Sequence, residues 1–184
     1  MKRLSHFAVK NEGFTLVELI IVICVFSILV ALAMPAWQNF VLNERLNSTQ
    51  GNIINAINLA KGMAVTDDTT ATMCPYSAAS STTCGSSWAS GVIVVEQSVA
   101  SGSVLLKAIP ATSGMPVLST LTAGISSITF NPRPPFVTNF TDFKLCDSRG
   151  ASYAMAFSLQ STGYVQTAPT IGYAMNGSSS LTCP

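Results

Sequence analysis

The sequence predicts an α+β protein, in which a long N-terminal helix packs on a mostly antiparallel β domain. In the first third of the chain, an apolar run leads directly into a segment whose apolar residues recur at helical spacing. Most of the remaining chain consists of short segments with the two-residue period of β-strands. The 184 residues include 9 Lys or Arg and 8 Asp or Glu, so 9% are charged, where a soluble domain has about 25%. The net charge of +1 excludes a protein that binds nucleic acid through a broad basic surface.

The apolar run predicts a membrane-spanning segment. The 19 residues from Leu19 to Trp37 carry no charge and would cross roughly 28 Å of hydrocarbon at a rise of about 1.5 Å each. The residues before it carry Lys2, Arg3 and Lys10 against Glu12, a net charge of +2 over residues 1–13. By the positive-inside tendency, we expect this end in the cytoplasm and everything after Trp37 to be exported.

Glu18 is an acidic residue at the start of the apolar run. Insertion scales give a cost of roughly 2.5 to 3.5 kcal/mol for an acid at the bilayer centre, and less near the interface. Either the carboxylate lies at headgroup depth, or a cation from another chain neutralises it. A small-residue cleavage site at 31–33 would suit a signal peptide, but the apolar run continues past it.

The helix is expected to extend well beyond the apolar run, from Phe14 to about Val65, with Thr66, Asp67 and Asp68 ending it. Apolar and small residues recur there at steps of three and four, while Asn39, Asn43, Asn47 and Asn55 lie largely off this stripe. We expect the stripe to pack on a sheet; it comprises Leu42, Leu46, Thr49, Ile53, Ile57, Ala60 and Ala64.

The remainder predicts a β domain of short strands separated by Gly, Pro, Ser and Asn clusters. Pro132, Pro134 and Pro135 predict a loop, because proline cannot donate ladder hydrogen bonds. The expected strands are Thr70–Cys74, Gly91–Gln97, Val104–Ile109, Ser126–Phe130, Asp142–Cys146, Tyr153–Leu159 and Tyr164–Thr167.

The cysteines indicate an oxidising compartment. Cys24 lies in the apolar run, and the other four, an even number, lie in the exported part: Cys74, Cys84, Cys146 and Cys183. Three pairings are possible. We favour Cys74 with Cys84, which closes a short loop, and Cys146 with Cys183, which would fix the Ser-rich C-terminus. A zinc site is disfavoured, since no CxxC spacing occurs and the one histidine is His6.

No residue pattern predicts catalysis. With no histidine after residue 13, the usual general base of Ser and Cys nucleophiles is missing. Adjacent Asp67 and Asp68 are typical of a solvated turn, and a Ser-Lys dyad would rest only on scattered lysines. We expect no enzyme, no metal and no cofactor.

The eight residues Gly13-Phe14-Thr15-Leu16-Val17-Glu18-Leu19-Ile20 resemble the cleavage and methylation signature of type IV pilins and type II secretion pseudopilins. The resemblance implies that a prepilin peptidase of the inner membrane cuts between Gly13 and Phe14. It also implies that Phe14 is then N-methylated, and that Glu18 pairs with the amino terminus of a neighbouring subunit. Pro35 fits the family's proline that kinks the first helix.

This resemblance divides the chain into a cleaved leader (1–13), the transmembrane half of the helix (14–37), its amphipathic half (38–66) and a disulfide-bonded β domain (67–184). It implies a single-pass inner-membrane protein with a periplasmic C-terminal domain before assembly, and a pilus or pseudopilus subunit afterwards. Cleavage would change the formal net charge from +1 to −1.

Further along, a series of short segments occurs in the order Thr72-Met73-Cys74, Cys84, Trp88, Gly91–Val95, Ile128–Asn131, Phe143–Cys146 and Phe157–Gly163. Taken in this order, the segments are similar to the FimT/GspH group of minor pilins and pseudopilins. The similarity implies a subunit that assembles into, or primes, the tip of a type IV pilus or type II secretion pseudopilus. Its partners would be other pilin or pseudopilin subunits.

Two alternatives concern binding. DNA-binding members of this group carry Gly-Arg-x-Arg near the C-terminus, where this chain reads Gly163-Tyr164-Val165-Gln166. With no charge after Gly150, this edge is expected to lack the electrostatic attraction for phosphate, although Arg133, Lys144 and Arg149 could form a displaced patch. DNA uptake and display of an adhesin-like binding module therefore remain alternative functions.

Overall fold

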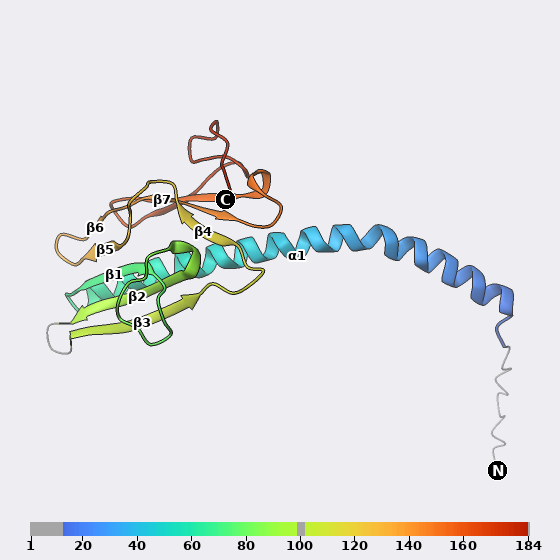
Figure 1. Ribbon diagram of the computed structural model, residues 1–184, viewed down its shortest axis with the longest axis horizontal. Coiled ribbons are helices and arrows are strands. Elements are labelled where there is room, and N and C mark those ends of the chain that lie inside the picture. Colours follow the sequence, from blue (N-terminus) through green and yellow to red (C-terminus); the bar gives the residue numbers. More distant parts are fainter. Residues whose placement is uncertain (1–12, 99–101, 184) are drawn as a thin grey trace, which may run out of the picture. The chain divides into compact units, whose positions relative to one another are not determined.

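A computed structural model describes residues 13–98 and 102–183 (Figure 1). The expected leader therefore lies outside the described residues except for Gly13. Two compact units are distinguished, Met1–Val41 and Leu42–Pro184. A single helix, α1 (Leu16–Thr66), begins in the first unit and ends in the second.

The described part of the first unit is the N-terminal portion of α1. All side chains from residue 13 to residue 40 are exposed, so no core forms here. Within the described residues, α1 is the one helix long and apolar enough to cross a membrane. Pro35 lies inside the helix, where its ring removes one backbone hydrogen bond; the kink remains a prediction.

The described residues of the second unit form two antiparallel sheets. The first has the strand order β3-β2-β1-β5-β6, and the second has the order β4-β7-β8-β9. The consecutive strands β2 and β3 pair antiparallel, and β1 pairs with β2 on one side and β5 on the other. The strands are β1 (Thr70–Pro75), β2 (Gly91–Ser98), β3 (Gly102–Pro110), β4 (Val117–Thr120), β5 (Ile128–Asn131), β6 (Phe136–Thr138), β7 (Asp142–Cys146), β8 (Met155–Leu159) and β9 (Val165–Thr167).

One core is shared by the second half of α1 and both sheets. The helix contributes the predicted stripe: Leu46, Ile53, Ile57, Ala60 and Ala64 are buried, together with Ala56, while Leu42 and Thr49 are half-buried. The four asparagines are exposed, as the pattern predicts. The α+β class, with a long helix packed on antiparallel sheets, is thus confirmed.

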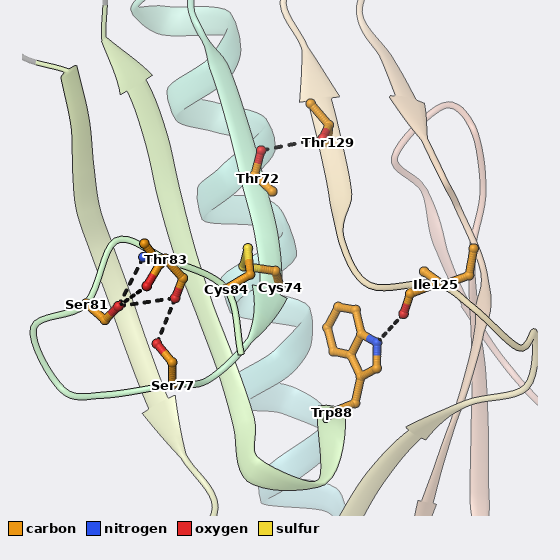
Figure 2. The surroundings of a disulfide bond; sticks show 9 residues. All are labelled: Thr72, Cys74, Ser77, Ser81, Thr83, Cys84, Trp88, Ile125 and Thr129. Carbon is orange, nitrogen blue, oxygen red and sulfur yellow. Dashed lines mark hydrogen bonds between the residues drawn. A yellow bond between two sulfur atoms is a disulfide. The ribbon is translucent and has the colours of Figure 1, made fainter. Parts of the chain in front are cut away.

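Aromatic residues link the segment before β2 to the second sheet within this core. Trp88, from the short 3-10 helix η1 (Trp88–Ser90), meets the Phe143 ring edge-on at 5.4 Å, and Phe143 stacks on Phe157 at 5.1 Å. The indole Nε1 of Trp88 donates a hydrogen bond to the carbonyl of Ile125 (2.7 Å; Figure 2). The indole is therefore buried with its polar atom satisfied, as buried tryptophans require.

Successive side chains of a strand point to opposite faces of the sheet, so one set enters this core and the other set lies on the outer face. On β1 and β2, Cys74, Ile93 and Val95 face outward and pack under Tyr76 of the following loop. On β7 and β8, Cys146 and Ala156 face outward and pack under the C-terminal segment. We call residues 75–85 the first cover and residues 168–183 the second cover.

Three differences from the sequence prediction concern short elements. Strands β4 and β6, of four and three residues, were not predicted. Tyr153, expected to begin a strand, instead ends the 3-10 helix η2 (Ala151–Tyr153), and β8 begins at Met155. The helix begins at Leu16 rather than Phe14, because Thr15 caps it.

Candidate assembly site

The N-terminus of α1 is organised by Thr15. Its hydroxyl Oγ1 accepts a hydrogen bond from the Glu18 amide (3.2 Å), and its carbonyl accepts one from the Leu19 amide (3.2 Å). Thr15 is therefore the N-cap, and Thr15 and Glu18 occupy the two positions of a capping box. The sequence reasoning missed this role, although the Thr-x-x-Glu spacing ahead of an apolar run is its signature.

The cap fixes Glu18 in the first turn of the helix. Unpaired amide groups give this end of a helix a partial positive charge, which favours a carboxylate. The Glu18 residue is exposed, and its side chain has no ion-pair or hydrogen-bond partner within residues 13–98 and 102–183. An acidic group is thus held in a defined place while remaining free to accept a cation from another molecule.

Gly13 and Phe14 precede the cap in backbone without regular structure. Nothing lies within 4 Å of the position that a Cβ of Gly13 would occupy, and Phe14 is 82% exposed. The peptide bond expected to be cleaved is therefore open to an enzyme in the described part of the chain. Cleavage and N-methylation remain predictions.

The apolar residues that follow present a continuous exposed surface. The apolar side chains between residues 16 and 30 are all exposed, so the described residues supply no partner for this surface. A bilayer or the apolar helices of other subunits would remove it from water. Free Cys24 lies within this surface.

Both disulfides join a strand to its cover. Cys74 is bonded to Cys84, and Cys146 to Cys183, which is the pairing favoured from the sequence. Figure 2 shows the first bond on the opposite side of β1 from α1, with the loop of the first cover held by hydrogen bonds among Ser77, Ser81 and Thr83. The disulfides therefore complete the outer layer rather than the shared core.

The three cations of the expected displaced patch each have a local partner. Arg133 pairs with Asp68 at the surface (2.9 Å), and Lys144 donates to the carbonyl of Thr182. The side chain of Arg149 is only 11% exposed; it binds Asp147 through Nε (2.9 Å) and Nη2 (2.6 Å). Carboxylates therefore balance two of the three charges, and the third cation is already bonded to a carbonyl.

The turn between β8 and β9 has no charged residue of its own, but it receives one cation from α1. Lys61 of α1 donates from Nζ to the carbonyl of Thr162 (3.1 Å), beside Gly163. Sequence reasoning missed this because the two positions are 101 residues apart. A single lysine already bonded to a carbonyl offers one charge, whereas phosphate-binding proteins use several.

Among the residues that the structure describes, no group of three or more His, Cys, Asp or Glu side chains could hold a metal ion.

Comparison with known proteins places the chain in a family. Residues 50–163 match the type II transport protein GspH, and residues 9–34 match the prokaryotic N-terminal methylation motif. No curated protein matches the chain. The second match confirms the resemblance seen in residues 13–20.

A solved structure agrees on the fold. The type IV minor pilin FimU of Pseudomonas aeruginosa strain PAO1 aligns with a TM-score of 0.52 at 17% identity, covering 71% of this chain and 92% of FimU. A second crystal form of FimU gives a TM-score of 0.49 at 16% identity, covering 67% and 93%. Since the GspH match spans more than half of the sequence, the chain belongs to the family of the type II transport protein GspH.

Proposed function

We propose that the chain is a minor pilin or pseudopilin subunit, which assembles through its N-terminal helix into, or primes, the tip of a type IV pilus or type II secretion pseudopilus. The observation that carries the proposal is the capped start of α1, with an unpaired Glu18 in its first turn ahead of an exposed apolar helix. Membership of the GspH family supports the same function, because the resemblance to minor pilins and pseudopilins implies a structural subunit.

Processing would create the cation that Glu18 lacks. A prepilin peptidase cuts between Gly13 and Phe14, which leaves a positively charged amino group on Phe14 that is then N-methylated. In a neighbouring subunit, this amino group pairs with the Glu18 carboxylate. The pairing offsets the cost of carrying a carboxylate into a layer of apolar helices.

Before assembly, the chain is held in the inner membrane by residues 14–37, with the second unit in the periplasm. The net charge of +2 before the apolar run supports this orientation. The two disulfides support it as well, because such bonds persist in oxidising compartments.

Two substitutions in the full-length chain test the proposal in the host cell. Gly13→Glu is expected to leave an uncut precursor in the inner membrane. Glu18→Val is expected to be processed normally, but little of the variant should be found in sheared filaments or in complexes with partner subunits. Glu44→Val is the matched control, since Glu44 is another exposed acid on α1.

The opposite outcomes of the two experiments would contradict different parts of the proposal. A normally sized mature chain from Gly13→Glu would refute cleavage at this bond. Recovery of Glu18→Val with partner subunits at the level of Glu44→Val would refute the assembly role of Glu18. Mass spectrometry of the mature N-terminus checks whether Phe14 carries the methyl group.

A further inference from the structure

The uncharged stretch of α1 is longer than a bilayer needs. No charged residue lies between Glu18 and Glu44, which leaves residues 19–43 uncharged, about 37 Å of helix at a rise of about 1.5 Å per residue. The hydrocarbon layer is about 30 Å thick. The helix could therefore slide by several residues without moving a charge into lipid, so another feature has to set its depth.

Two aromatic residues mark one level of this stretch. Trp37 and Phe40 lie three positions apart on α1, and their ring centroids are 5.9 Å from each other. Trp37 is 66% exposed and Phe40 56%, so the first unit does not bury either ring. Side chains three positions apart share one face of a helix, so the rings form a single projecting pair.

The character of the helix changes at this pair. On its N-terminal side, the two rings wall an apolar groove together with Val30, Ala33, Met34 and Ala36. Polar amides begin at the pair itself: Gln38 and Asn39 lie between the two aromatic residues, and Asn43 follows them. An amphipathic ring at such a transition suits the bilayer interface, where Trp is enriched because its ring is apolar and its N–H is polar.

We propose that Trp37 and Phe40 set the depth of α1 by lying in the headgroup and glycerol layer of the leaflet that faces the second unit. The occupant of the groove is then the upper part of a phospholipid acyl chain. This inference rests on the proposed function, in which α1 spans the inner membrane.

The proposal also assigns a depth to Glu18. Glu18 precedes Trp37 by 19 residues, roughly 28 Å along the helix. With Trp37 at one interface, the carboxylate of Glu18 lies at the opposite boundary of the hydrocarbon layer, within reach of water. An unassembled subunit can thus hold the carboxylate at headgroup depth and offer it to a partner's amino group on assembly.

Fluorescence quenching of the full-length chain in vesicles tests this depth. The vesicles contain phosphatidylethanolamine, phosphatidylglycerol and a phosphatidylcholine brominated either near the glycerol end or near the methyl end of its acyl chain. The signal of Trp37 is the difference between the unmodified chain and Trp37→Phe, because the other tryptophan, Trp88, is buried in the shared core. The reference for a deep position is Phe26→Trp in the Trp37→Phe background.

We expect Trp37 to be quenched more by bromine near the glycerol end, and the Phe26→Trp indole more by bromine near the methyl end. Stronger quenching of Trp37 by the methyl-end lipid would overturn the inference. So would protection of Trp37 from both lipids and from aqueous iodide, since another copy of the chain would then cover the ring. If neither lipid quenches the Phe26→Trp indole, the membrane span itself fails and the inference fails with it.

A second measurement tests whether the pair fixes the register. The starting point is Phe26→Trp in the Trp37→Phe background, which keeps aromatic rings at both positions without the signal of Trp37. Replacing both rings by Ala (Trp37→Ala with Phe40→Ala) should make quenching of the Phe26→Trp indole by the two lipids more nearly equal, because the helix samples several depths. Leu29→Ala with Leu32→Ala is the matched control, since it also removes two exposed apolar side chains but leaves the pair. An unchanged quenching ratio after removal of the pair would overturn the proposed role.

Discussion

The ammonium group of Lys61 donates a hydrogen bond to the carbonyl of Thr162 (3.1 Å), and the aliphatic part of the same side chain lies against Gly163. This contact joins α1 to the turn between β8 and β9, where Gly163 has a φ of 75°. A Cβ at Gly163 would lie 3.0 Å from Cδ of Lys61. The glycine is therefore required both by its backbone conformation and by the lysine that crosses it.

Gly163→Ala should destabilise the protein through both effects. A left-handed conformation alone costs about 1 kcal/mol for a residue with a Cβ, and displacement of Lys61 adds to it. Gly124→Ala is the control, because Gly124 has a φ of 82° with nothing within 4 Å. Thermal unfolding in detergent should show a larger loss for Gly163→Ala, and Lys61→Ala should reduce that difference. Equal losses at the two glycines would refute the contact.

Removing the disulfide that closes the longer loop should lower the free energy of unfolding more than removing the disulfide that closes the shorter loop. The sequence separations are 37 and 10 residues, for which the chain-entropy relation gives about 4 and about 3 kcal/mol. Chemical unfolding of Cys146→Ala with Cys183→Ala, against Cys74→Ala with Cys84→Ala, checks the order. A greater loss from the shorter loop would show that the entropy of the unfolded chain does not decide the difference.

Thr15→Ala should loosen the first turn of α1. Loss of an N-cap costs about 1 kcal/mol, because the Glu18 amide loses its acceptor. Hydrogen exchange in detergent should become faster at the Glu18 and Leu19 amides, and Thr15→Ser should restore the slower rate. Unchanged exchange in Thr15→Ala would mean that the hydroxyl does not stabilise this turn.

The two ion pairs in the described part of the second unit should respond differently to removal of the arginine. Arg149→Met leaves the carboxylate of Asp147, only 4% exposed, without its partner and should cost about 3 kcal/mol. Arg133→Met breaks a pair whose side chains are 78% and 50% exposed and should cost less than about 1 kcal/mol. Chemical unfolding measures both variants. Similar small losses for the two would indicate that the Asp147 carboxylate is hydrated.

The sequence predicted the longer elements because their periodicity reflects burial. The stripe on α1 depends on the 3.6-residue period of a helix, and the buried side chains follow it from Leu46 to Ala64. In strands such as β2 and β7, apolar and polar residues alternate, or an apolar run is long enough to be recognised. The signature around Glu18 likewise gave the candidate site before its geometry was known.

The shorter elements depend on partners that are distant in sequence. β4 has only four residues, of which Leu118 is buried, and it exists as a strand because it pairs with β7. β6 follows two prolines and is defined by its pairing with β5. The contact of Lys61 with the turn at Thr162 has the same origin, since no local pattern connects the two.

The placement of the disulfides has a consequence for the order of maturation. The shared core contains none of the four bonded cysteines, which lie instead with the two covers. The helix and both inner sheet faces can therefore come together while every thiol is still reduced. Oxidation then closes the outer layer, so the final surface of the subunit is set by when and where its thiols meet an oxidant.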